Sequence, residues 1–138
     1  MLDGKQLQKS DVIIVEMNNR LPRILLAISA AILLLGSFMH TSAFKKVGAV
    51  VAFSNLPAFY GNALKALWLI DSITLSILGV TFATIALRPV NVRRSLILLL
   101  GLIPAGTSIL LYTFIGIFIP AHMLLVAAIL IFIAGFLL

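Results

Sequence analysis

The 138-residue chain has no cysteine and only four acidic residues, against ten lysines and arginines. The lack of cysteine excludes disulfides, thiolate metal sites and cysteine nucleophiles. Phosphate-binding loops, dinucleotide fingerprints and hydrolase triads are also absent. Charged residues make up only 10% of the chain, whereas hydrophobic residues make up 62%. Such a composition, gathered in long apolar runs, is typical of a membrane protein. The sequence leaves catalysis open but favours a chain that does not catalyse a reaction on its own.

The formal net charge of +6 does not indicate nucleic-acid binding here. The basic residues lie beside the apolar runs, where membrane topology and lipid headgroups account for them. The partners we expect are therefore the lipid bilayer and other membrane proteins or further copies of the chain, and not a nucleic acid.

Four apolar runs are long enough to cross the hydrocarbon core of a bilayer, about 30 Å thick. The sequence therefore predicts an all-α integral membrane bundle of four transmembrane helices in one domain at 21–138, after a polar or interfacial tail at 1–20. The expected spans are 21–39, 62–87, 95–119 and 121–138.

The segment between the first two spans, residues 42–61, is too polar and too broken to cross the bilayer. Its apolar residues, among them Val47 and Val50, share one helical face, and Lys45 and Lys46 lie off that face. This pattern predicts a short helix resting in the membrane interface.

Basic residues indicate the orientation. The tail, the following Arg23 and the turn at 88–94 together carry seven lysines and arginines, whereas the opposite side carries Lys45, Lys46 and Lys65. Because basic loops stay in the cytoplasm, we expect both termini to be cytoplasmic in a cytoplasmic (inner) membrane.

Asp71, inside the second expected span, is the only acidic residue after Glu16. An aspartate near the middle of a span costs roughly 3 kcal/mol on insertion, so it usually faces protein or water and marks a functional site. A structural role, in which Asp71 ties its helix to a neighbour, is the alternative.

An up-down topology places Tyr112 at a depth similar to that of Asp71, so the sequence predicts that a Tyr112–Asp71 hydrogen bond can form. A proton site or a quinone headgroup site would then lie in the outer half of the bundle. The candidate residues are Asp71, Tyr112, His40, His122, Ser108 and Thr74.

His40 and His122 both fall at the outer membrane boundary, where two histidines could ligate a haem or a metal. One histidine per helix end lacks the fixed spacing of a metal signature. The sequence therefore makes them weak candidates only, and it leaves the cofactor undetermined between quinone, haem and none.

Small residues recur at helical spacing on the second and third spans, where they would let another helix approach closely. Pro104 adds an expected kink near Leu100. The expected packing residues are Ser72, Ser76, Gly79, Ala83, Gly101, Ala105 and Gly116.

Over roughly residues 20–100 the chain resembles the DoxX-like family of small four-helix membrane proteins. The resemblance is carried by Arg23-Ile24-Leu25-Leu26, Leu35-Gly36 with His40, Ala52-Phe53 with Leu56-Pro57, the acid Asp71, and Leu78-Gly79 before a basic turn. The chain departs from the family pattern by having aspartate where glutamate is usual. The resemblance implies a bundle of four helices, associated in some members with membrane sulfur or quinone redox systems.

We therefore expect a small integral membrane accessory subunit, or an assembly partner, of a larger membrane complex such as a respiratory or redox complex. The alternative is a redox- or proton-handling protein that binds a quinone, haem or other small ligand in the outer half of the bundle. A further alternative is an oligomeric transporter, because four helices alone enclose little space.

Overall fold

The computed structural model describes the backbone of residues 4–88 and 92–138, and side chains from Arg20 onward. The described residues form four helices and no strand. Each helix contains a stretch that is long and apolar enough to cross a membrane, which confirms the predicted all-α, four-span architecture. The helices are α1 (Gly4–Ala52), α2 (Ala58–Leu87), α3 (Arg94–Phe114) and α4 (Ile119–Leu137).

The breaks between helices follow local chemistry. Pro57 precedes α2 with φ −53° and ψ 144°, a conformation that proline favours and that ends the preceding helical path. Gly116 has φ +95°, which only glycine adopts without strain, and it turns the chain out of α3. Pro120 then lies in the first turn of α4, where its missing N–H is not needed.

The helices differ from the expected bounds in three places. Residues 42–52 continue α1 without a break, so the described chain contains no separate interfacial helix. No proline or pair of glycines interrupts that stretch, and the first break comes at 53–57. The third span ends at Phe114 and not at 119, because Gly116 redirects the backbone. Gly4 to Arg20 also belong to α1, so the expected tail is not a separate element.

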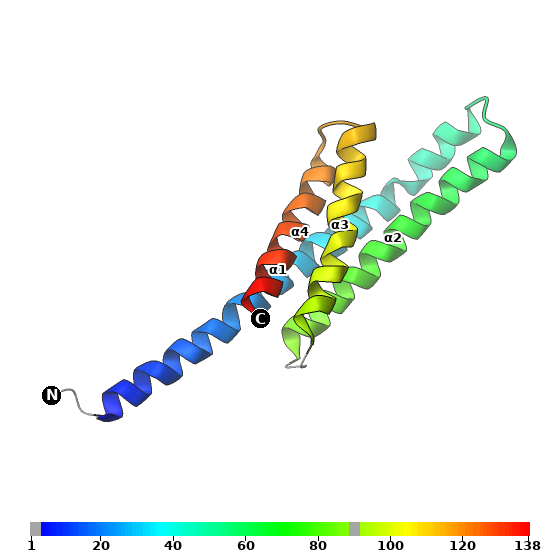
Figure 1. Ribbon diagram of the computed structural model, residues 1–138. Helices are drawn as coiled ribbons and strands as arrows, with labels where there is room; N and C mark the ends of the chain where they lie inside the picture. Colours follow the sequence, from blue (N-terminus) through cyan, green and yellow to red (C-terminus); the bar gives the residue numbers. More distant parts are fainter. Residues whose placement is uncertain (1–3, 89–91) are drawn as a thin grey trace.

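The four helices form a partly open bundle (Figure 1). α1 packs along both α2 and α4, α3 packs along α4, and no other pair of helices packs closely among the described residues. Figure 1 also shows that the α1–α2 hairpin extends beyond the turn joining α3 to α4. The hairpin and the α3–α4 pair therefore meet mainly where α1 contacts α4.

All four helices contribute to a single apolar core. Leu33 of α1, Phe82 of α2, Ile97 of α3 and Ile131 of α4 are fully buried. Most large apolar side chains on the outer faces are exposed, as expected where lipid replaces water around the protein.

Small residues lie where helices approach most closely. A methyl group at Gly79 would lie 2.7 Å from Cγ of Leu34 and 3.3 Å from the carbonyl oxygen of Ala30. At Gly101 a methyl group would lie 2.9 Å from Cγ2 of Ile131 on α4. Gly116 is different, because it lies in the α3–α4 turn and not on a span.

We predict that Gly79→Ala lowers the free energy of unfolding by about 1–3 kcal/mol, because the side chain of Leu34 and the carbonyl oxygen of Ala30 on α1 leave no room for a methyl group. Thermal or denaturant unfolding in detergent micelles measures this. Gly106→Ala is the matched control, since a methyl group there meets nothing within 4 Å. An equal loss of stability in both variants would contradict the proposed close approach at Gly79.

Candidate functional site

Polar side chains collect between α1 and α2 in what we call the His40 cluster. Residues three apart on α1, and residues three or four apart on α2, face the same seam because of the helical repeat. The members are Ser37 and His40 on α1, and Trp68, Asp71, Ser72 and Ser76 on α2.

His40 is the centre of this cluster. Its Nδ1 lies 2.9 Å from Oγ of Ser72, and its Nε2 lies 3.5 Å from Oδ2 of Asp71. The imidazole stacks on the indole of Trp68, with ring centroids 3.9 Å apart and an angle of 8° between the planes. Trp68 also donates its indole N–H to the carbonyl oxygen of His40 at 2.7 Å. Both ring nitrogens, one ring face and the backbone of His40 are therefore held by α2.

A second group of hydrogen bonds continues the seam next to His40. Ser37 donates to the carbonyl oxygen of Ser72 at 2.8 Å, and its hydroxyl lies 2.6 Å from that of Ser76. The hydroxyl of Ser72 lies 3.1 Å from the carbonyl oxygen of Trp68. No buried side-chain polar atom of the described residues lacks a partner, so the seam is fully hydrogen-bonded.

The hydrogen bonds that the cluster can form depend on the number of protons that His40 and Asp71 carry. With both nitrogens of His40 protonated, Nε2–H faces the carboxylate of Asp71, and Nδ1–H donates to Ser72. The hydroxyl of Ser72 can then donate to the carbonyl oxygen of Trp68. If the imidazole is neutral and Asp71 is ionised, one of these hydrogen bonds is lost, or a bare nitrogen faces the carboxylate. All of these hydrogen bonds can therefore form together when the His40–Asp71 pair carries one proton more than a neutral imidazole and an ionised carboxylate would carry.

The pair is partly open to its surroundings. The side chain of His40 is 24% exposed and that of Asp71 is 37% exposed. The described residues therefore do not enclose the carboxylate of Asp71 completely.

The position of the His40 cluster along the bundle axis can be measured from the contact between Ser29 of α1 and the carbonyl oxygen of Ala127 of α4. Along α1, His40 lies eleven residues, about 16 Å, from Ser29. In the same direction along the bundle, the start of α4 lies eight residues, about 12 Å, from Ala127. The cluster thus lies near the level where α4 begins, at one boundary of the four-helix region. Trp68 is typical of such a boundary.

Tyr112 and His122 form a separate contact between α3 and α4. Their rings meet edge to face, with centroids 5.4 Å apart. Nδ1–H of His122 donates to the carbonyl oxygen of Phe118 at 2.9 Å, and buried Ser108 donates to that of Ala121 at 3.0 Å. The hydrogen bond of Ser108 links α3 to α4, whereas that of His122 lies at the start of α4 itself.

The predicted Tyr112–Asp71 hydrogen bond is not formed. Asp71 pairs with His40, whereas Tyr112 contacts His122, because α3 packs along α4 and not along α2. Thr74 donates to the carbonyl oxygen of Ile70 in its own helix and is not part of the cluster.

The structure places the two histidines in separate contacts, His40 against α2 and His122 against α3. The described residues contain no group of three or more histidines and acids that could hold a metal ion. Both nitrogens of His40 already have partners within the protein. The geometry therefore offers no support for a haem held by both histidines.

Sequence reasoning did not include Trp68 among the candidate site residues, and it treated Ser72 and Ser76 only as packing residues. The signal that joins them to Asp71 is the spacing of Trp68, Asp71 and Ser72 within one helical turn, opposite a histidine at the end of the first expected span. Ser37 carried no distinct signal, because a hydroxyl is also common at helix contacts in membranes.

Comparisons with protein-family models, curated proteins and solved structures gave no match for this chain. The function must therefore be argued from the geometry of the chain itself.

We predict that Ser72→Ala lowers the free energy of unfolding by about 0.6–1.7 kcal/mol, the range measured for single hydrogen bonds between helices in membranes. Ser42→Ala is the control, since that hydroxyl bonds only within its own turn. A double-mutant cycle with His40→Ala should be non-additive, because the two side chains share one hydrogen bond. Additive losses would contradict a direct interaction.

Proposed function

We propose that this chain is a proton-handling membrane protein and that the His40–Asp71 pair is the group that binds the proton. The observation that carries the proposal is the position of Nε2 of His40, 3.5 Å from Oδ2 of Asp71, with Nδ1 fixed on Ser72. Histidine is the side chain whose ordinary titration falls between pH 5 and 8.

Charge at a membrane boundary supports this function. With one shared proton the pair is neutral, whether the proton lies on His40 or on Asp71. A second proton leaves a net positive charge, and loss of the shared proton leaves a net negative charge. Both states are costly near lipid. The pair is therefore suited to exchanging single protons.

The hydrogen bonds favour exchange on one side of the membrane over conduction across it. From His40 the path reaches the hydroxyl of Ser72 and then the carbonyl oxygen of Trp68. Ser37 joins the seam through the carbonyl oxygen of Ser72. A carbonyl oxygen accepts a hydrogen bond but has no proton to pass on. The path therefore ends within the cluster.

The proposed orientation keeps both termini in the cytoplasm of a cytoplasmic (inner) membrane. It is supported by the arginines at the end of the bundle that carries the 88–93 turn, including Arg88, Arg93 and Arg94. In this orientation the His40 cluster lies toward the opposite side of the membrane.

A groove in the outer half of the bundle is open to a small ligand such as a quinone, if the protein uses one. This open, mainly apolar groove of about 570 Å³ lies beside the α3–α4 turn and includes Ile32, Phe118 and His122 in its lining. His122 is its only titratable side chain, so a ligand there would not contact the His40–Asp71 pair through these lining residues.

The fluorescence of Trp68 tests the proton-handling function. Trp68 is the only tryptophan in the chain, and it stacks on His40. A protonated imidazole quenches a stacked indole, so we predict that emission from the purified protein in lipid nanodiscs falls as the pH is lowered through the range in which His40 binds its proton. Asp71→Asn should be brighter than the wild type at the same pH, because the imidazolium loses its counter-charge.

His40→Gln should abolish the transition, and His122→Gln should retain it. Circular dichroism checks that the helices of each variant are intact. Emission that does not change between pH 5 and 8, or a transition that persists in His40→Gln, would overturn the proposal.

A second candidate is the accessory subunit of a larger membrane complex, for which the outer face of α2 is the specific observation. α2 packs closely only along α1, and Ile70, Ile73 and Ile77 on its outer face are exposed beside Asp71. A neighbouring membrane chain could cover this face and bond to Asp71. Ser72, Ser76 and Gly79 of α2 already contact α1 of the same chain. These small residues therefore support packing against a partner less than expected.

Purification from native membranes in mild detergent tests this candidate. We predict that, if the chain is a subunit, a partner copurifies in constant stoichiometry and Asp71→Asn reduces its recovery several-fold. Thr84→Ala, at an exposed hydroxyl that bonds only within its own helix, is the control. Recovery of the chain alone would contradict the accessory role without affecting the fluorescence test.

A further inference from the structure

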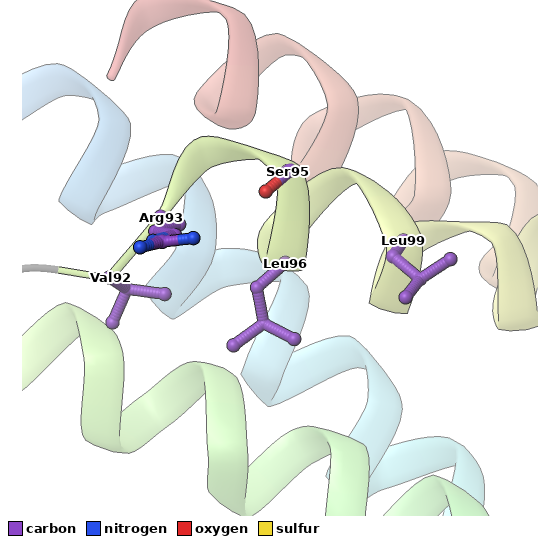
Figure 2. A pocket seen from close by; sticks show the side chains of 5 residues that line it. All are labelled: Val92, Arg93, Ser95, Leu96 and Leu99. Carbon is purple, nitrogen blue, oxygen red and sulfur yellow. The ribbon is translucent and has the colours of Figure 1, made fainter.

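A second polar feature lies at the opposite end of the bundle from the hairpin turn, where α3 begins. An open groove of about 660 Å³ is lined by Val92, Arg93, Ser95, Leu96 and Leu99. Figure 2 shows Val92, Leu96 and Leu99 on the side of α3 that faces α2. The groove exists because α2 and α3 do not pack closely along each other.

The groove is divided by polarity along its length. Leu96 and Leu99 lie on one face of α3, and with Val92, just before the helix, they form an apolar floor. Arg93 and Ser95 supply a cation and a hydroxyl at the end nearest the turn. A cationic mouth followed by an apolar floor matches the order of groups in a phospholipid, in which a phosphate is followed by acyl chains.

Arg93 and Arg94 make no ion pair with an acidic residue in the part of the chain that the structure describes. Arg94 lies over the ring of Phe136, 4.7 Å from its centroid, which directs it toward α4. The guanidinium of Arg93 makes no ion pair, hydrogen bond or ring contact with the residues that the structure describes. No acidic residue follows Asp71 in the chain. The groove therefore offers an arginine that is available to an external anion.

We propose that this groove binds one anionic glycerophospholipid, with its phosphate at Arg93 and Ser95 and an acyl chain along Val92, Leu96 and Leu99. Basic pockets between membrane helices recognise anionic headgroups in this way. The first turn of α3 has no side-chain cap, so its N–H groups add to the attraction for phosphate. The alternative occupant is a transmembrane helix of another protein, which is about 10–12 Å across with its side chains. Such a helix would leave Arg93, at the cationic end of the groove, without a counter-charge. The site is independent of the His40 cluster.

Native mass spectrometry of the delipidated protein tests the proposal. The probes are phosphatidylglycerol and phosphatidylcholine with identical acyl chains. We predict that the wild type binds phosphatidylglycerol several-fold more tightly than phosphatidylcholine. Arg93→Gln should weaken phosphatidylglycerol binding about fivefold, the effect expected of one basic contact. Lys46→Gln, at an exposed lysine on the hairpin, is the matched charge control and should bind as the wild type does.

Leu99→Trp tests the apolar floor, because a larger side chain there should fill the groove and lower the binding of phosphatidylglycerol. Glycerol 3-phosphate tests whether the headgroup alone is enough, and it should bind far more weakly than the intact lipid. Equal binding of the two lipids, equal effects of Arg93→Gln and Lys46→Gln, or glycerol 3-phosphate binding as tightly as the lipid would overturn the proposal.

Discussion

The structure depends on hydrogen bonding across the α1–α2 seam. In a membrane, polar side chains facing a neighbouring helix must find partners within the protein, because lipid offers none. Ser37, His40 and Ser72 satisfy one another across the seam, and Gly79 lets the two backbones approach further along. Directional contacts of this kind fix the register of the two helices, which apolar packing alone leaves less defined.

The same interactions explain why Asp71 can remain in an apolar helix. Its carboxylate is not isolated, because an imidazole that is itself held by Ser72 and Trp68 lies 3.5 Å away. The insertion cost of an acid is thus offset by a partner whose position is fixed in advance. A structural ion pair and a proton-binding site share this geometry.

Much of the fold could be predicted from the sequence. Four apolar runs set the number of helices, and Asp71 and His40 were identified as candidates from their rarity and position. Which helices pack together could not be predicted, because a small residue such as Gly79 or Gly101 indicates a close approach without naming the partner. The predicted Tyr112–Asp71 contact failed for this reason. The structure does not show a separate interfacial helix, because residues 42–52 contain no helix breaker and continue α1.

The unequal lengths of the helices have a consequence for how the protein sits in lipid. α4 has 19 residues, about 28 Å, which matches the hydrocarbon core of an average bilayer, whereas α2 has 30 residues, about 45 Å. Hydrophobic mismatch therefore acts differently on the two helix pairs. The longer pair, α1 and α2, must tilt or protrude from the bilayer, whereas the shorter pair, α3 and α4, need not. A change in bilayer thickness would shear one pair against the other along the α1–α4 contact, where Ser29 meets Ala127.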